Sequence, residues 1–147
     1  MAFDETDRLG TELEVVADFD LTLLLEHLGG RVAVLRNSLD SGRHTLWLEL
    51  VPTEKDLEDA VRRYAAMVDA LPQAVRHLWN ASLDRCLNTG IQAGRRPPSF
   101  ILELSPASMA LEAAISTRHQ FTVYALQPKR AGSSGTSRRG PRASDEP

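Results

Sequence analysis

Cysteine, lysine and long apolar runs are scarce or missing in this sequence. The single cysteine, Cys86, cannot form an internal disulfide, so nothing indicates an oxidising compartment. No stretch approaches the roughly 18 consecutive apolar residues of a membrane-spanning helix, and no basic-then-apolar signal segment opens the chain. We therefore expect a cytoplasmic protein with no part in a membrane.

The charge balance is acidic, with 20 Asp and Glu residues against 17 Lys and Arg residues, a net charge of −3. This balance argues against a dedicated nucleic-acid binder. Only Lys55 and Lys129 are lysines, and we attribute the excess of arginine to a GC-rich bacterial genome. A chain of 147 residues, 42% of them hydrophobic, is long enough for one domain with a real core.

The two ends differ from the middle. Residues 1–10 are polar and acidic without an apolar period, which predicts a flexible segment before a single domain at 11–126. Residues 127–147 contain no large apolar side chain, so we interpret them as a disordered basic tail. The tail has five basic and two acidic residues, a net +3, which leaves −6 on the rest. Such a tail can contact nucleic acid or an acidic partner, but we favour a solubilising role.

The hydrophobic period changes from element to element between these ends. Period-two alternation predicts strands at 11–17, 31–36, 44–51, 82–92, 100–104 and 120–126, with the second and third joined as a hairpin. Short helices are expected after Asp20 and after Ser105-Pro106, where capping residues precede apolar faces. Trp47 lies on the outer face of its strand and is either half-covered or exposed.

The clearest helix follows Thr53. Apolar residues recur there at spacings of four and three, and Pro72 predicts a kink or two abutting helices. These apolar residues are Leu57, Val61, Tyr64, Val68, Leu71, Val75 and Leu78. The order β-α-β-β-α(α)-β-β-α-β predicts an α+β fold, with helices packed on one face of a mainly antiparallel sheet.

No catalytic or cofactor motif survives comparison with a simpler structural explanation. The four histidines match no metal-ligand spacing, Cys86 has no partner cysteine, and no glycine-rich phosphate loop is present. We therefore expect no metal, no cofactor and no catalytic residues, and we interpret Cys86 as a small buried apolar residue.

Two groups of residues are candidates for binding. The first is Trp47 with the carboxylates that open the long helix, namely Glu54, Asp56, Glu58 and Asp59. The second is the pair Arg95 and Arg96, which a stiff proline loop could hold for a carboxylate or phosphate. The simpler alternatives are a solvated helix start favoured by the helix dipole and an exposed charged loop.

The stretch FILELSPASMALEAAISTRHQFTVYAL, at 100–126, resembles the ending of a small bacterial family, domain-of-unknown-function family number 4279. The resemblance is carried by Leu104-Ser105-Pro106, Leu111, Ile115, Phe121 and Tyr124, with Leu28-Gly29, Trp47 and Asp56 in the expected order upstream. Gly30-Arg31-Val32 departs from the charged, proline-bearing turn of that family. The resemblance implies an α+β fold and a place among toxin-immunity and accessory proteins. It carries over no catalytic residue.

We therefore expect a non-enzymatic bacterial binding protein, possibly of the immunity type, whose acidic surface meets a basic protein partner. The alternative is a small enzyme or ligand-binding domain that uses Arg95, Arg96 and a histidine such as His119 in a cleft beside the sheet. The sequence does not indicate an oligomeric state.

Overall fold

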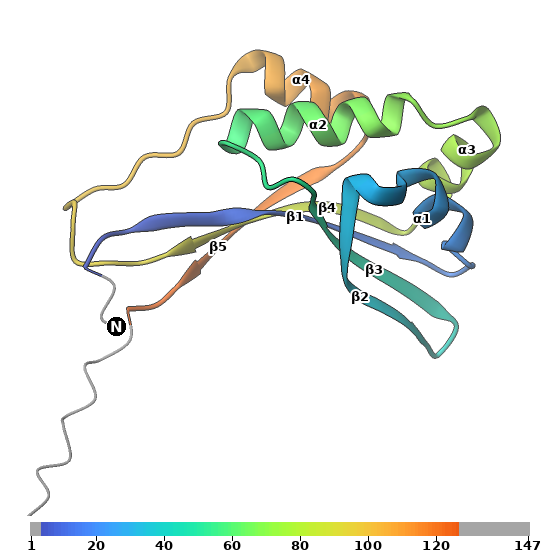
Figure 1. The fold of residues 1–147 in the computed structure, drawn as a ribbon, viewed down its shortest axis with the longest axis horizontal. Coiled ribbons are helices and arrows are strands. Elements are labelled where there is room, and N and C mark those ends of the chain that lie inside the picture. Colours follow the sequence, from blue (N-terminus) through green and yellow to red (C-terminus); the bar gives the residue numbers. More distant parts are fainter. Residues whose placement is uncertain (1–3, 127–147) are drawn as a thin grey trace, which may run out of the picture.

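The computed structural model describes residues 4–126, which form a two-layer arrangement of one sheet and four helices (Figure 1). In chain order the elements are β1 (Asp7–Ala17), α1 (Thr22–Leu28), β2 (Val32–Asp40), β3 (Arg43–Leu50), α2 (Leu57–Asp69), α3 (Gln73–Ala81), β4 (Asp84–Gln92), α4 (Pro106–Ala114) and β5 (Arg118–Tyr124). A 3-10 turn at Gly29–Arg31 follows α1.

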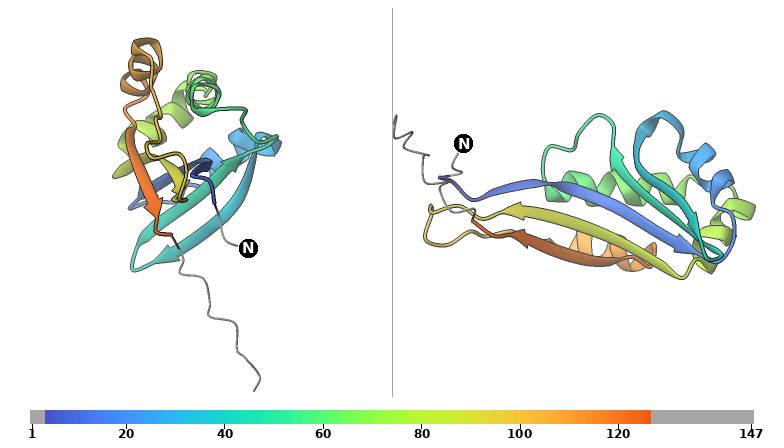
Figure 2. Two further views of the ribbon diagram at one scale, coloured as in Figure 1. Left: turned by 90° about the vertical axis from the view of Figure 1, so that its left-hand side faces the viewer. Right: turned by 90° about the horizontal axis from the view of Figure 1, so that it is seen from below.

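The five strands lie in the order β2-β3-β1-β4-β5, and only the β4–β5 pair is parallel. The helices gather on one face of this sheet, while the other face is left open, as the view from below shows (Figure 2). The predicted α+β fold, with a mainly antiparallel sheet and helices on one face, is therefore confirmed.

The core lies between the sheet and the helix layer. Side chains of β1 alternate strictly between the two faces, so Leu13 and Val15 are buried under the helices while Glu12 and Glu14 point the other way. The indole of Trp79 fills the core at the end of α3, and its Nε1 donates to the Ile115 carbonyl at 2.8 Å. Cys86 is buried as a free thiol, as expected.

The predicted long helix is two helices that meet around Pro72. Its four-and-three pattern places one face of α2 inside the core, and Tyr64 and Val68 are almost wholly buried there. Tyr64 also donates its hydroxyl proton to the Thr11 carbonyl at 3.0 Å, which ties α2 to the central strand. Two abutting helices were one of the alternatives left open by the sequence.

The hairpin is longer than the sequence pattern suggested. β2 continues to Asp40, and the chain reverses over Ser41 and Gly42, which both have positive φ. Two successive residues of positive φ form the tight turn whose twist matches that of paired strands. Residues 37–40, which lie between the two expected strands, therefore belong to the strand and not to the connection.

The strand expected at 100–104 does not form, and that prediction is wrong. The edge of β4 is paired with β5 and not with this segment. Its far end is also held in the helix layer, because Ser105 donates from both its N–H and its hydroxyl to Glu58 of α2. The alternating apolar residues thus belong to a connection that climbs from the sheet to α4 (Figure 1).

The chain ends also differ from expectation in one respect. β1 begins at Asp7, inside the segment 1–10 that we expected to be flexible, and Glu5 forms an isolated bridge with Arg96. The predicted disordered tail, 127–147, lies outside the described residues. Within residues 4–126 no helix is long and apolar enough to span a membrane.

Substitution of Val68 by aspartate should unfold the protein. Val68 is 1% exposed on the core face of α2, and an unpaired charge there costs several kcal/mol, which is comparable to the whole stability of a small domain. Thermal unfolding followed by circular dichroism would show the loss. Ala66→Asp, on the exposed side of the same helix, is the matched control, and equal midpoints for the two variants would remove this face from the core.

Candidate functional site

The open face of the sheet carries an acidic patch around one tryptophan. We call Glu12, Glu14, Trp47 and Glu49 the open-face patch. In the register of β1 and β3, Glu12 lies directly opposite Glu49, and Glu14 lies directly opposite Trp47. Like charges placed directly opposite each other on paired strands are destabilising, so this arrangement is costly unless a cation joins it.

Within residues 4–126 none of the three carboxylates of the patch forms an ion pair. Asp84, on the same face, is a useful contrast, because it is paired. Arg118 donates from Nε to Asp84 Oδ1 at 2.9 Å and from Nη2 to Oδ2 at 2.8 Å. This hydrogen-bonded pair holds the pKa of Asp84 below its usual value. Arg36, opposite Trp47 in the register, donates its Nε–H to Ser38 at 3.1 Å.

The electrostatic environment of Glu12 reflects this imbalance. Burial raises the pKa of the Glu12 carboxyl, the indole N–H of Trp47 opposes the rise, and the negative charges of Glu49 and Glu54 reinforce it. Trp47 is half-buried, and its fully covered Nε1 acts on the Glu12 carboxyl. The patch therefore combines excess negative charge with one covered indole donor that serves Glu12.

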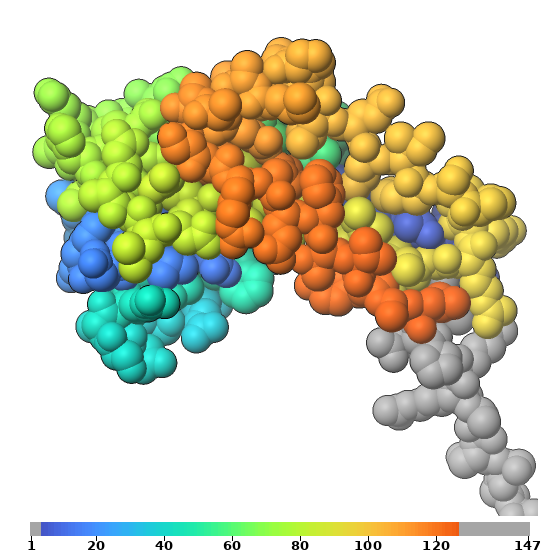
Figure 3. Space-filling model, turned by 180° about the vertical axis from the view of Figure 1, so that it is seen from behind, coloured from blue at the N-terminus to red at the C-terminus, as the bar shows by residue number. Residues whose placement is uncertain are grey.

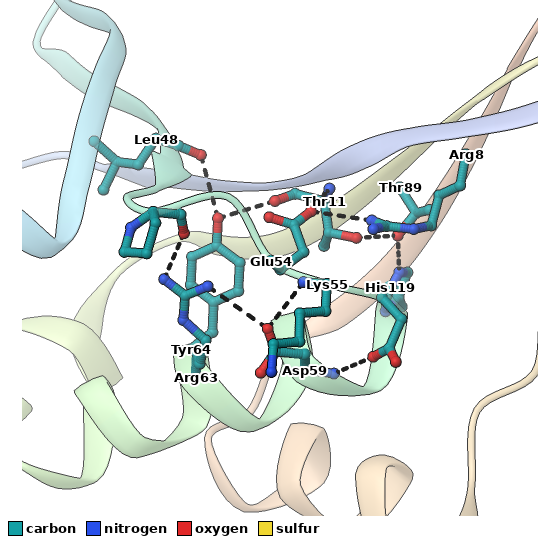
Figure 4. Close-up of polar contacts among 12 residues, drawn as sticks. Arg8, Thr11, Leu48, Glu54, Lys55, Asp59, Arg63, Tyr64, Thr89 and His119 are labelled. Atoms are coloured by element: carbon teal, nitrogen blue, oxygen red, sulfur yellow. Dashed lines mark hydrogen bonds and ion pairs between the residues drawn. The ribbon is translucent and has the colours of Figure 1, made fainter.

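Glu54 closes the end of the β1–β3 pairing beside this patch. It is 7% exposed, accepts the Thr11 backbone N–H at 2.7 Å and pairs with Arg8 at 3.0 Å (Figure 4). A cavity of about 100 Å³ lies here, with the carboxylates of Glu12, Glu49 and Glu54 in its lining. The carboxylates also raise the pKa of Tyr64, for which burial is the main cause.

The other carboxylates at the start of α2 are engaged inside the protein. Asp56 caps the helix by accepting the Asp59 N–H at 2.8 Å. Glu58 accepts from Ser105 and Ser108, and these bonds lower its pKa. Asp59 is 8% exposed and accepts the Lys55 N–H, which lowers its pKa, and Arg63 pairs with it (Figure 4). Arg62 also pairs with Asp59. The structure thus separates Trp47 from this acidic helix start, which belongs to the opposite side of the sheet.

The predicted pair Arg95 and Arg96 lies on the connection between β4 and α4. Both residues are exposed, and their backbone N–H groups donate to the Asp4 carbonyl at 3.0 and 2.9 Å. Figure 3 shows the molecule hollowed between this connection and β5. A cavity of about 560 Å³ lies between the connection and the residues before β1, and it is lined by Glu5, Thr6, Arg96, Pro97, Pro98 and Phe100. His119 is not in its lining, so the structure does not bring the expected arginine and histidine together in this cavity.

His119 belongs instead to a buried hydrogen-bonded chain between α4, β5, β4 and β1. Its Nδ1 contacts Glu112, its Nε2 lies 2.7 Å from the Thr89 hydroxyl, and Thr89 lies 2.7 Å from the Thr11 hydroxyl (Figure 4). A carboxylate, a histidine and a hydroxyl in line resemble a nucleophile-activating arrangement. Thr89, however, is 0% exposed, so no substrate reaches the hydroxyl and the chain serves to join the strands.

Metal ligation finds no support in the part of the chain that the structure describes, because no three His, Cys, Asp or Glu side chains there come together in a ligating arrangement. Comparison with protein-family models, with curated proteins and with solved structures found no match to this chain.

Of the open-face patch, the sequence analysis singled out only Trp47. Glu12 and Glu14 look like the ordinary polar face of a strand in the sequence, and only the register of β1 and β3 shows that Glu49 lies opposite Glu12.

Glu12→Gln should stabilise the protein at neutral pH. The folded pKa of Glu12 is raised, so the ionised carboxylate opposes folding, and the penalty grows as pH rises through that folded pKa. Urea unfolding at pH 7.5 should show a gain of roughly 0.5 kcal/mol, typical of a relieved like-charged cross-strand pair. The gain should disappear below about pH 4, where both states are protonated. An equal gain for the exposed Glu26→Gln would contradict this account.

His119→Ala should cost about 3 kcal/mol of stability, because it leaves the buried Glu112 carboxylate without its partner. The neighbouring Arg118→Ala removes a more exposed pair, with Asp84, and should cost less than about 1 kcal/mol. Chemical denaturation of the two variants separates these cases. Similar losses for both would mean that the His119 chain does not hold the strands together.

Proposed function

We propose that this protein is a non-catalytic binding protein whose open-face patch takes up a basic segment of a protein partner. The observation that carries the proposal is the set of three carboxylates around Trp47 that form no ion pair among the described residues. Lysine and arginine side chains supply the missing positive charge, and arginine can also stack on the indole ring.

Several physical features support an interface at this face. Helices cover only the other face, so the strands present a broad surface to solvent (Figure 2). A half-buried tryptophan among charged neighbours is the residue type most often found at the energetic centre of an interface. Complementary charge around it increases the association rate and sets the orientation of the partner. These features favour recognition of a surface over turnover of a substrate.

The biological class remains the one expected from the sequence, a bacterial immunity-type or accessory protein that acts in the cytoplasm. This class rests only on the resemblance noted for residues 100–126 in the sequence. Such proteins act by covering a partner, and an acidic face suits a basic one. The contact surface proposed here differs from the helix start considered first, because those carboxylates are already bonded within the protein.

A second candidate function is the binding of a small anionic ligand at Arg96. The cavity of about 560 Å³ beside Arg96 and Phe100 is the observation that favours it, since it joins a guanidinium to apolar walls. Arg95→Gln with Arg96→Gln should leave binding at the open-face patch intact, so this double variant separates the two functions.

The proposal is tested with a fluorescein-labelled octalysine peptide and the full chain, by fluorescence anisotropy at low and high salt. Combined substitution Glu12→Gln, Glu14→Gln and Glu49→Gln should weaken binding about tenfold, since three exposed pairs of roughly 0.5 kcal/mol each are lost. Trp47→Ala should cost on the order of 2 kcal/mol if the indole is a central anchor.

The matched control removes the same net charge elsewhere on the surface. Asp18→Asn, Glu26→Gln and Glu103→Gln change three exposed carboxylates outside the patch and should change the affinity by less than about threefold. Equal losses for the two triple variants would reduce the effect to net charge and overturn the proposed site.

A further inference from the structure

The sheet has two outer strands, β2 and β5, and their free edges differ. β2 carries a bulge just before Arg36 and the charged side chains of Arg36 and Asp40. Bulges and charges are devices by which proteins keep an edge strand from pairing with another chain. β5 has no bulge in its register with β4, and Arg118, its one permanently charged residue, is already bound to Asp84. The outer edge of β5 is therefore open to another strand.

The backbone groups of β5 point outward in a fixed alternation. The Ala93 N–H donates to the Tyr124 carbonyl at 3.0 Å, so the backbone of Tyr124 faces β4. Alternate residues of a strand direct their N–H and C=O groups to opposite sides, so the backbone groups of His119, Phe121 and Val123 face away from β4. Within residues 4–126 no strand pairs with them, and Figure 3 shows β5 uncovered at the surface below α4.

The apolar side chains of β5 are exposed on the same side as the helices. The Phe121 ring stacks on the His119 ring with a centroid distance of 4.6 Å, and His119 contacts Glu112 of α4. Phe121 and, two residues further, Val123 therefore lie on the helix side of the sheet. Phe121 is 45% exposed and Val123 is 62% exposed, so the helix layer leaves this part of the sheet uncovered.

Helix α4 continues this surface. Its only charged residue, Glu112, is buried against His119, and Met109 lies one helical turn before Glu112, on the side of β5. The exposed residues of α4 are all uncharged, although a surface helix normally turns charged side chains to solvent. They are Pro106, Ala107, Met109, Ala110, Ala113 and Ala114. Figure 2 shows α4 above β5 at the margin of the molecule, so the strand edge and this side of the helix adjoin.

We propose that this surface binds a second copy of the chain, with the two β5 strands paired antiparallel about a two-fold axis that passes between their Phe121 residues. The two sheets then form one continuous sheet, and both helix layers lie on the same side of it, with the two α4 helices next to each other. The open-face patch lies on β1 and β3, which β4 separates from β5. The dimer therefore leaves the patch uncovered and is independent of the proposed function.

The register centred on Phe121 makes the two strands complementary in their side chains. Phe121 lies in the middle of β5 and meets the Phe121 of the second copy, an aromatic pair of the kind that stabilises antiparallel strands. The remaining opposed pairs are His119 with Val123, Gln120 with Thr122 and Arg118 with Tyr124. No charge therefore meets its like, and the Arg118 guanidinium lies opposite an aromatic ring on which it can stack.

The backbone fits the same register. Residues directly opposite each other exchange hydrogen bonds only where both face the other strand. In this register the three outward-facing residues, His119, Phe121 and Val123, meet only one another, so each of them donates and accepts across the axis. β5 thus offers to a second copy both the backbone groups and the side chains that a partner strand needs, which favours a second copy over an unrelated strand.

The interface is small, which predicts a weak and reversible dimer. β5 and the adjoining side of α4 contribute about ten residues from each copy, against roughly 20 to 30 on each side of a standard interface. Interfaces below the standard size are typical of transient association. We therefore expect a dissociation constant on the order of 10 μM.

Sedimentation equilibrium of the full chain, at concentrations from about 2 to about 500 μM, measures this association. The native chain should pass from monomer to dimer over this range. Phe121→Lys and Val123→Lys should each weaken the dimer at least about tenfold, because the first places like charges opposite each other and the second places a charge in the apolar contact. Leu39→Lys, at an exposed apolar residue of the other outer strand, is the matched control and should dimerise like the native chain. Circular dichroism checks that each variant is folded.

Cysteine cross-linking tests the register. Directly opposed residues of a hydrogen-bonded antiparallel pair have Cα atoms about 5.5 Å apart, which is within the range of a disulfide. Phe121→Cys should therefore give a covalent dimer on mild oxidation. Val123→Cys should not, because Val123 lies opposite His119 and is about 13 Å along the strand from its own counterpart. The native chain, whose Cys86 is buried, should give none.

The possible outcomes are distinct. A native chain that stays monomeric up to about 500 μM would overturn the proposal and leave the edge to a strand of another protein. Equal weakening by Leu39→Lys would reduce the effect to net charge and overturn it as well, as would cross-linking at Val123 in place of Phe121.

The outcome for the dimer is also separable from that for the proposed function. Phe121→Lys should bind the labelled octalysine peptide within about threefold of the native affinity, since the open-face patch is unchanged. A native chain that dimerises but does not bind the peptide would overturn the proposed function and leave the dimer in place.

Discussion

The arrangement of the whole sheet depends on how the end of the β1–β3 pairing is closed. β1 extends beyond its last partner in β3 at Glu12, so the Thr11 N–H has no strand carbonyl on that side. The carboxylate of Glu54 takes this place, and Arg8 balances it. A charged acceptor makes a strong hydrogen bond to a backbone N–H, and it also brings negative charge next to Glu12.

The same closure fixes the start of the helix layer. Glu54 is held at Thr11, and the chain continues within two residues to Asp56, which caps α2. The hydroxyl of Tyr64 then reaches the carbonyl of the same Thr11. One residue of the central strand thus receives contacts from the connection and from the main helix. The carboxylate of Glu54, which joins the two layers, thus adds its negative charge to the surroundings of Glu12.

Sequence periodicity predicted the elements whose environment is set locally. The pattern of α2 was visible because its buried face repeats within one helix. The strand expected at 100–104 failed because alternation shows only that a segment could pair, and it is β5 that pairs with β4. The acidic start of α2 looked like a surface site, yet caps and ion pairs consume Asp56 and Asp59. Asp56 and Asp59 are engaged by neighbours within four residues, whereas the outcome at 100–104 depended on a strand distant in the sequence.

The open-face patch was hidden from the sequence for the same reason. Glu12 and Glu49 become neighbours only through the register of two strands that a helix and a hairpin strand separate along the chain. Their opposition costs stability, and natural proteins keep such local conflicts where function requires them. Trp47 could be placed on the outer face from alternation alone, but its covered Nε1 could not be foreseen.

The position of β1 has a consequence for folding during synthesis. β1 is the central strand of the sheet but the first to leave the ribosome. Its β3 edge is filled once residue 49 has been made, whereas its β4 edge waits for residues 84–92, and β5 closes the sheet last. Pairings this far apart along the chain slow folding, and an unpaired central strand attracts other strands meanwhile. The glutamates along β1, which the finished protein displays on its open face, also put charge on this strand while it waits for its partners, and charge on an unpaired strand disfavours association with other chains.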